Sequence, residues 1–286
     1  MQFLVVCSKV FLSLALTALL LACANTTRSG AVGIDRPQFL MVSASQVDKI
    51  SAASYSEQNQ KAKEKNILIT SGPAYDRLKT ISTRLIAQTR IFRDDSQQWN
   101  WQLVLINAPI LNATCAPGGK ITFYTGLIEQ LNLNDDEIAA IMGHEIAHAL
   151  REHGRERLSQ AMAQSAVANV AMAVAGPYGS AVSAANQAAQ YVLVLPNSRQ
   201  NESEADAIGL ELAARAGYNP RAAISVWQKM NKATEGKGTF EFLSTHPSGD
   251  TRIEQLTELM PTVEPLYLTS QNPEKSNTVI QKIKQQ

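Results

Sequence analysis

The segment 135–153, DDEIAAIMGHEIAHALREH, is the most informative stretch of the chain. Asn134 or Asp135 can cap a helix at its start, and the acidic residues that follow place negative charge at the helix N-terminus, which the helix dipole favours. Apolar residues then recur at helical spacing as far as His153, and Gly154 comes next. We therefore expect a largely apolar helix that ends near His153.

Two histidines on this helix have the spacing of metal ligands. His144 and His148 are four residues apart, so both imidazoles lie on one face and can share a zinc ion. Glu145 lies about 100° further around the helix axis, a position that suits a general base for the attacking water. Composition alone would produce this pattern in about 1% of chains of this length. The alternative is a polar helix face with accidental histidines, but the apolar neighbours oppose it, because buried polar groups need partners.

A third ligand is needed, because catalytic zinc uses three protein ligands and an open fourth position. The segment 198–206, SRQNESEAD, supplies candidates at the start of a helix expected over residues 201–216. Glu202 and Asp206 are one turn apart, so one carboxylate can bind the metal while the other supports a ligand. The alternative is a solvated helix start whose acidic residues are favoured by the helix dipole.

Four blocks, taken in order, resemble peptidase family M48, the Ste24/HtpX/Oma1-like zinc metallopeptidases, and in particular bacterial lipoprotein members with one catalytic domain. The resemblance covers roughly residues 70–260 and is carried by residues 115–121 with 125–127, residues 143–148, residues 198–206, and residues 244–247 with 252–253. It implies a zincin-like domain of the α+β class, mainly α-helical, with one Zn²⁺ per chain and polypeptide substrates.

The resemblance also implies roles for single residues. His144, His148 and Glu202, not Glu204, correspond to the metal ligands, and Glu145 corresponds to the catalytic base that later protonates the leaving amine. Asp206 resembles the aspartate that orients a zinc-bound histidine, expected to be His144.

Three further residues lie in or near these motifs. His246 is expected to stabilise the transition state or to occupy the open zinc position in a latent form, unless it only packs near the site. His153 is expected to face solvent at the helix end, and Arg252 to pair with a carboxylate near the metal.

The segment before the helix indicates extended structure. Residues 99–106 and 120–125 are rich in aromatic and branched side chains, and we expect them to form a small antiparallel sheet. Strand 121–125 could accept an extended substrate at its edge, or it could be a simple core strand. The Ala-rich segment 159–194, interrupted by Gly176-Pro177, is expected to pack against the motif helix as two helical pieces, with a cover over the site as the alternative. Other helices are expected over residues 46–65, from about 73 to 91, and from about 220 to 232.

The N-terminus resembles a targeting segment. Residues 10–22 are apolar after Lys9, too short to cross a bilayer comfortably, and suit a signal-peptide core. They end at Leu20-Leu21-Ala22-Cys23, which resembles a bacterial lipobox, so Cys23 is the expected lipidation site. Alanine at position 24 favours the outer membrane over the inner one. Ordinary secretion and a retained anchor helix are the alternatives.

The expected organisation is a lipoprotein-type signal peptide over residues 1–22, a tether over 23–45, the metallopeptidase domain over 46–262 and a polar C-terminal tail over 263–286. Removal of Cys7 and acylation of Cys23 would leave Cys115 without an intramolecular disulfide partner.

Composition and the resemblance together limit the function. A net charge of +1 and 6% aromatic residues argue against nucleic-acid binding. The resemblance implies an endopeptidase on the periplasmic side of the bacterial envelope that degrades misfolded or misassembled proteins. A chaperone-like module without turnover and a structural zinc protein are the alternatives, and the intact Glu145 argues against the first of these.

Overall fold

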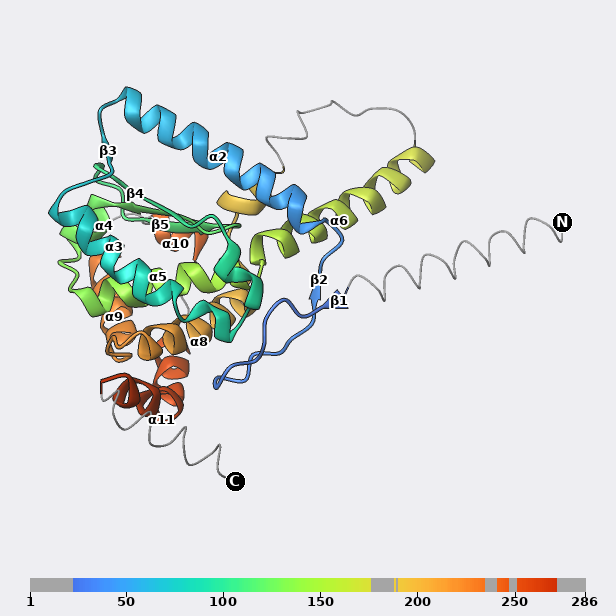
Figure 1. Cartoon of the computed structure of the whole chain (residues 1–286). Helices are drawn as coiled ribbons and strands as arrows, with labels where there is room; N and C mark the ends of the chain where they lie inside the picture. Colours follow the sequence, from blue (N-terminus) through green and yellow to red (C-terminus); the bar gives the residue numbers. More distant parts are fainter. Residues whose placement is uncertain (1–22, 176–187, 189, 235–240, 247–250, 272–286) are drawn as a thin grey trace.

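The computed structural model describes residues 23–175, 188, 190–234, 241–246 and 251–271 (Figure 1). The predicted signal peptide, the Gly176-Pro177 turn and residues 272–286 lie outside the described residues. The described part is mainly helical with a small sheet, as the sequence predicts. Its elements in chain order are β1 (Cys23–Ala24), β2 (Gln38–Phe39), α2 (Ala44–Glu64), β3 (Leu68–Ile69), α3 (Pro73–Ile86), the 3-10 helices η1 (Thr89–Ile91) and η2 (Asp94–Gln98), β4 (Gln102–Ile106), β5 (Ala113–Ala116), β6 (Lys120–Tyr124), α4 (Thr125–Gln130), α5 (Asp135–Leu150), α6 (His153–Ala175), the π-helix η3 (Gln190–Val194), α8 (Arg199–Arg215), α9 (Ala222–Thr234), α10 (Glu241–Thr245) and α11 (Thr251–Gln271).

The expected sheet is present, but it is mixed rather than antiparallel. Its strand order is β3-β4-β6-β5. The two predicted strands are neighbours, yet β4 and β6 run parallel, with Gln102 opposite Lys120. The difference arises because the segment between them contains β5, which pairs antiparallel with β6 at the sheet edge. Consequently β6 is an inner strand without an edge for a peptide, whereas β5 is the last strand of the sheet on that side.

Helices cover the two faces of this sheet. Val104 and Ile106 point to one face and pack with Tyr55 of α2. Leu105, between them in sequence, belongs to the main core, together with the inward-facing side chains of β6 and the apolar residues of α5. This alternation follows from the two-residue period of a strand. Figure 1 shows α2 running across the sheet.

Helix α5 lies at the centre of the core. Asn134 accepts a hydrogen bond from the Glu137 backbone N–H, and the Glu137 side chain accepts one from the Asn134 backbone, so the predicted N-terminal cap is present. The helix ends at Leu150, slightly before the expected residue. Helix α8 crosses it in direct backbone contact, since a Cβ atom on Gly209 would lie 2.6 Å from the His144 nitrogen and one on Gly143 would lie 2.8 Å from the Gly209 oxygen.

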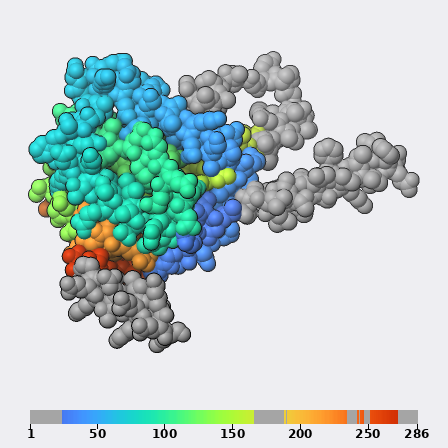
Figure 2. Space-filling view, in the orientation of Figure 1, coloured from blue at the N-terminus to red at the C-terminus, as the bar shows by residue number. Residues whose placement is uncertain are grey.

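Residues 23–45, which the sequence predicts to be a tether, lie against the domain. The backbone of Cys23 pairs with that of Phe39, and the Glu211 carboxylate accepts hydrogen bonds from the backbone N–H groups of Ala31 and Val32. Ala44 begins α2. Figure 2 shows the blue N-terminal residues lying against the rest of the surface. The polar, turn-rich residues 25–37 form a docked loop between β1 and β2.

The first part of the expected polar C-terminal tail is helical. Helix α11 continues through Pro261 and Pro265 to Gln271. Val263, the first residue of the expected polar tail, is completely buried. Among the described residues, none of the helices combines the length and the apolar character that crossing a membrane requires.

We expect Gly209→Ala to destabilise the fold, because the added methyl group would force α5 and α8 apart. Overpacking of this kind costs about 1–3 kcal/mol. Chemical denaturation measures the loss, and Ser203→Ala on the same helix, whose hydroxyl bonds to the side chain of Gln255, serves as the control. Equal stability of the two variants would contradict the close crossing.

Candidate metal centre

Four side chains from three parts of the chain form one buried cluster. His144 and His148 come from α5, Glu202 from α8, and His246 follows α10, and one donor atom from each lies within 4.8 Å of all the others. The two histidine Nε2 atoms are 3.0 Å apart. Glu202 approaches His148 Nε2 with Oε1 at 3.4 Å and His144 Nε2 with Oε2 at 3.5 Å. The structure thus brings together all three predicted ligands and His246.

The cluster favours positive charge. Burial opposes charge on His144, but hydrogen bonds to Asp206 and Glu202 outweigh it and raise the pKa of His144 to about 9. Burial likewise would raise the pKa of Glu202, yet His246, His144 and His148 hold it far below its usual range. The pKa of His148, in contrast, is lowered by burial. The ionised carboxylates of Glu202 and Asp206 thus favour positive charge beside His144, and a bound cation would supply such charge.

The donor set fits a metal ion such as zinc. Asp206 Oδ1 lies 3.0 Å from His144 Nδ1, and an ionised carboxylate can only accept, so Nδ1 carries the ring proton and Nε2 of a neutral His144 presents a lone pair. Two imidazole nitrogens and a carboxylate converging on one point are ligands that zinc binds in catalytic sites.

Asp206 and Glu202 are in turn held by one arginine. Arg252 donates to both oxygens of Asp206 at 2.7 and 2.6 Å and to Glu202 Oε2 at 2.7 Å. Its guanidinium carbon also lies 3.7 Å from the centroid of the Trp227 ring. The contact expected between Asp206 and His144 and the pairing expected for Arg252 are both present. Arg252 thus fixes the relative positions of a candidate ligand and its neighbour.

Glu145 lies beside the cluster with one oxygen unused. It is buried, and its Oε1 has no hydrogen-bond partner among the described residues, although His246 Nε2 lies 3.3 Å away. Burial raises the pKa of Glu145, and the charges of His246 and His144 offset this only in part. A buried carboxylate with a free oxygen and a raised pKa is suited to proton transfer.

The sequence profile of peptidase family M48 matches residues 75–260, which contain the whole cluster. The chain belongs to peptidase family M48.

Family members from several organisms are similar to this chain. The mitochondrial metalloendopeptidase OMA1 of Arabidopsis thaliana is 38% identical over 56% of this chain and 31% of its own length. The OMA1 protein of Saccharomyces cerevisiae is 36% identical over 58% of this chain and 49% of its own length. The beta-barrel assembly-enhancing protease of Escherichia coli is 24% identical over 68% of this chain and 40% of its own length. The chain thus spans less than half of each of these M48 relatives.

His153 does not face solvent, so that expectation was wrong. It is completely buried, and its Nδ1 lies 2.8 Å from His148 Nδ1. The reason is that α5 stops at Leu150, the chain turns at Glu152 with a φ of 50°, and α6 starts at His153. A continuous helix would have rotated His153 away from His148. The polar residues before Gly154 indicated that the helix ends there, but they did not indicate which way the His153 side chain points.

Glu204 is a second residue near the site to which the sequence analysis assigned no role. Its carboxylate accepts from His153 Nε2 at 3.2 Å and from the fully buried Arg151 at 2.8 Å, and it also pairs with Arg36. Burial would raise its pKa, but the hydrogen bonds from His153 and Arg36 outweigh burial and lower the pKa to about 2. The apolar residues beside it on α8, such as Ala205, could have indicated that Glu204 is buried.

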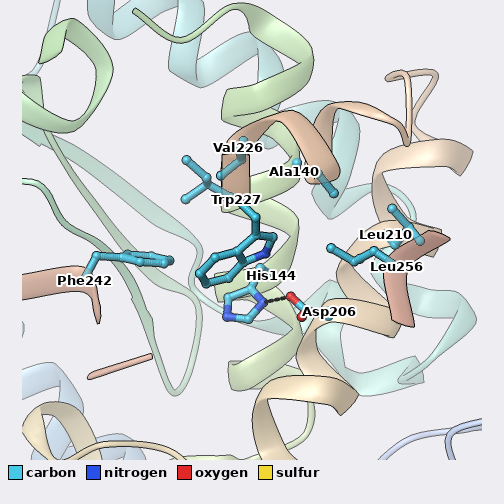
Figure 3. Close-up of a pocket in the computed structure, with 10 residues that line it drawn as sticks. Ala140, His144, Asp206, Leu210, Val226, Trp227, Phe242 and Leu256 are labelled. Carbon is cyan, nitrogen blue, oxygen red and sulfur yellow. Dashed lines mark hydrogen bonds and ion pairs between the residues drawn. The ribbon is translucent and has the colours of Figure 1, made fainter. Parts of the chain in front are cut away.

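Two cavities reach this M48 site. One is lined by Glu145, His148, Cys115 of the edge strand β5, and Arg157. The other is mainly apolar and lies behind His144. Figure 3 shows Trp227 and Phe242 flanking the His144 ring in this second cavity, and the hydrogen bond from that ring to Asp206. Open space therefore adjoins the cluster both beside Glu145 and behind His144.

We expect acid to destabilise the docking of the N-terminal segment. Burial would raise the pKa of Glu156, but hydrogen bonds from Arg36 and Gln38 lower it below 4.5. A depressed carboxyl pKa contributes stability that is present above the unfolded-state pKa and is lost as pH falls through the folded-state value. Stability should therefore decline as pH falls below about 4.5, and less steeply in Glu156→Gln. Thermal unfolding over a pH series measures this, and identical pH slopes would contradict it.

Proposed function

We propose that this chain is a zinc-dependent endopeptidase that acts in the bacterial cell envelope. The observation that carries the proposal is the buried cluster of His144, His148 and Glu202 with Glu145 beside it. These three ligands would hold one Zn²⁺. When bound, zinc supplies a Lewis acid that polarises the scissile carbonyl.

The protein side chains supply proton transfer and orientation. Glu145, buried and with a free oxygen, takes a proton from the attacking water and delivers it to the leaving amine. Asp206 keeps the His144 ring oriented through Nδ1, and Arg252 holds Asp206 in turn. These hydrogen bonds hold His144 and Asp206 in place, and such preorganisation reduces the rearrangement needed during the reaction.

His246 belongs to the same site and has two candidate roles. Its Nδ1 lies 3.0 Å from Glu202 Oε1, and its Nε2 lies 3.3 Å from Glu145 Oε1. The ring also stacks on Phe242, with centroids 4.4 Å apart. This placement among the donors supports occupation of the fourth ligand position in a latent form. Withdrawn from that position, the ring would remain close enough to stabilise charge that develops on the substrate.

Polypeptide substrates would bind along β5. This strand is at the edge of the sheet, and Thr114 and Cys115 line the cavity that also contains Glu145 and His148. An extended peptide can add to such an edge through backbone hydrogen bonds, which are independent of sequence. This mode suits a quality-control protease that must accept many unfolded segments.

The location in the envelope rests on the N-terminal sequence. The lipobox-like residues before Cys23 support lipidation there, with the outer membrane as the favoured site. Similarity to the beta-barrel assembly-enhancing protease of Escherichia coli supports a role in envelope protein quality control. Since residues 24–39 are docked on the domain, an acyl chain on Cys23 would hold the catalytic domain close to the membrane surface.

A second candidate, a structural zinc site on a binding or chaperone-like module, is favoured by one observation. With His246 the cluster offers four protein donors, and structural zinc sites are closed by four protein ligands. Chelator-sensitive proteolysis by the purified chain would rule this candidate out.

Zinc content and casein cleavage of wild type, Glu145→Gln and Glu202→Ala test the proposal. We expect Glu145→Gln to keep zinc and to lose activity by about 10²–10⁴-fold, because only the general base is removed. Glu202→Ala should bind less zinc, because it removes a ligand. Glu129→Gln, which neutralises an exposed carboxylate, is the control. Full cleavage by Glu145→Gln would refute the mechanism, and rescue of a cellular defect by this variant would favour the module without turnover.

We also expect Cys23→Ser to abolish acylation and to move the protein from the membrane to the soluble fraction, because the sulfur is the predicted attachment point. Metabolic labelling with a fatty acid and cell fractionation measure the two effects. Cys115→Ser, at a buried thiol within β5, should remain membrane-bound. Unchanged labelling of Cys23→Ser would show that Cys23 is not the acylated residue.

A further inference from the structure

His148 is supported from behind by side chains that the proposed reaction does not use. Its Nδ1 lies 2.8 Å from His153 Nδ1, and His153 Nε2 lies 3.2 Å from Glu204 Oε2. Arg151 donates to the same Glu204 oxygen through Nε at 2.9 Å and Nη2 at 2.8 Å. His153 and Arg151 are completely buried and Glu204 nearly so, so water does not compete for these contacts.

The direction of each hydrogen bond follows from the last member of this chain of contacts. Glu204 can only accept, so His153 Nε2 is the donor and a neutral His153 has its lone pair on Nδ1. In the contact between the two Nδ1 atoms, His148 must then be the donor. With its proton on Nδ1, His148 presents the lone pair of Nε2 to the cluster, which is the form that binds a metal.

The two candidate metal histidines are therefore supported in different ways. His144 donates directly to the carboxylate of Asp206 at 3.0 Å. His148 reaches the carboxylate of Glu204 through the intervening ring of His153. Outer hydrogen-bond partners of this kind fix the orientation of a metal-bound histidine and increase its affinity for the metal.

We propose that His153 and Glu204 are positioning residues that fix the ring orientation and tautomer of His148 for metal binding. The proposal rests on the proposed function, because it takes His148 as a metal ligand. It also links the N-terminal segment to the site. Arg36, in the loop between β1 and β2, pairs with both Glu204 and Glu156, and Arg151 donates to the Arg36 carbonyl at 2.9 Å.

Three substitutions of His153 separate its two contacts. His153→Asn keeps an acceptor near the position of Nδ1 but cannot reach Glu204. His153→Gln keeps a donor near the position of Nε2 but loses the acceptor for His148. His153→Phe loses both. We expect zinc affinity, measured on the full chain by competition with a chelator, to fall by about 10- to 100-fold in the Phe and Gln variants and by only a few-fold in the Asn variant.

A matched pair of carboxylates tests Glu204. Glu204→Gln and Glu156→Gln remove the same charge and each weaken one ion pair of Arg36, but only Glu204 contacts His153. We expect Glu204→Gln to weaken zinc binding and Glu156→Gln to leave it unchanged. A general loss of stability would lower the zinc affinity of both variants alike. Denaturation of the metal-free variants measures this contribution for each of them.

The proposal is overturned if His153→Phe keeps wild-type zinc affinity, or if the Asn and Phe variants lose equal amounts of zinc affinity. It is also overturned if Glu204→Gln and Glu156→Gln lose equal amounts. If His153→Phe does not fold, the zinc affinities of His153→Asn and His153→Gln still test the proposal, because only the Asn variant keeps the acceptor for His148. A wild-type chain that binds no zinc would instead refute the proposed function, so the two failures are distinguishable.

Discussion

The contact between α5 and α8 at Gly143 and Gly209 is the constraint on which the rest of the structure depends. A Cβ atom on either glycine would lie within 2.8 Å of the other helix's backbone, so the helices cross more closely than side chains normally permit. His144 follows the first glycine, and Glu202 and Asp206 lie on the same helix as the second. Close approach is what allows carboxylates of α8 to reach the imidazoles of α5.

Bringing these groups together buries several charges, and the surrounding structure compensates for them. An unpaired buried charge is costly, whereas a paired and hydrogen-bonded one can be tolerated. Arg252 neutralises Glu202 and Asp206 on one side of the cluster. Arg151 and Arg36 neutralise Glu204 on the other. Arg252 comes from α11, near the C-terminus, and Arg36 from the N-terminal segment, so both ends of the described chain contribute to the site.

Sequence reasoning located the α5 motif, its N-terminal cap and the acidic helix start that carries Glu202. These features are local, because their evidence lies in spacing along one helix. It also anticipated that His246 belongs with the site, although the residue lies more than forty positions after Glu202. It failed where the outcome depended on strand pairing. Two strands with the right pattern were identified, but β5 lay unrecognised between them and made the pairing of β4 with β6 parallel.

The sequence by itself therefore determined which residues can carry the chemistry, because residue type and helical period fix donor atoms and their common face. Only the tertiary structure decided how these residues are supported. The end of α5 at Leu150 turned His153 inward, and the docked N-terminal loop placed Arg36 on Glu204. Both outcomes depend on contacts between segments far apart in the chain. Distant neighbours decide whether hydrogen bonds compensate the cost of burying a polar side chain, and no local sequence pattern specifies those neighbours.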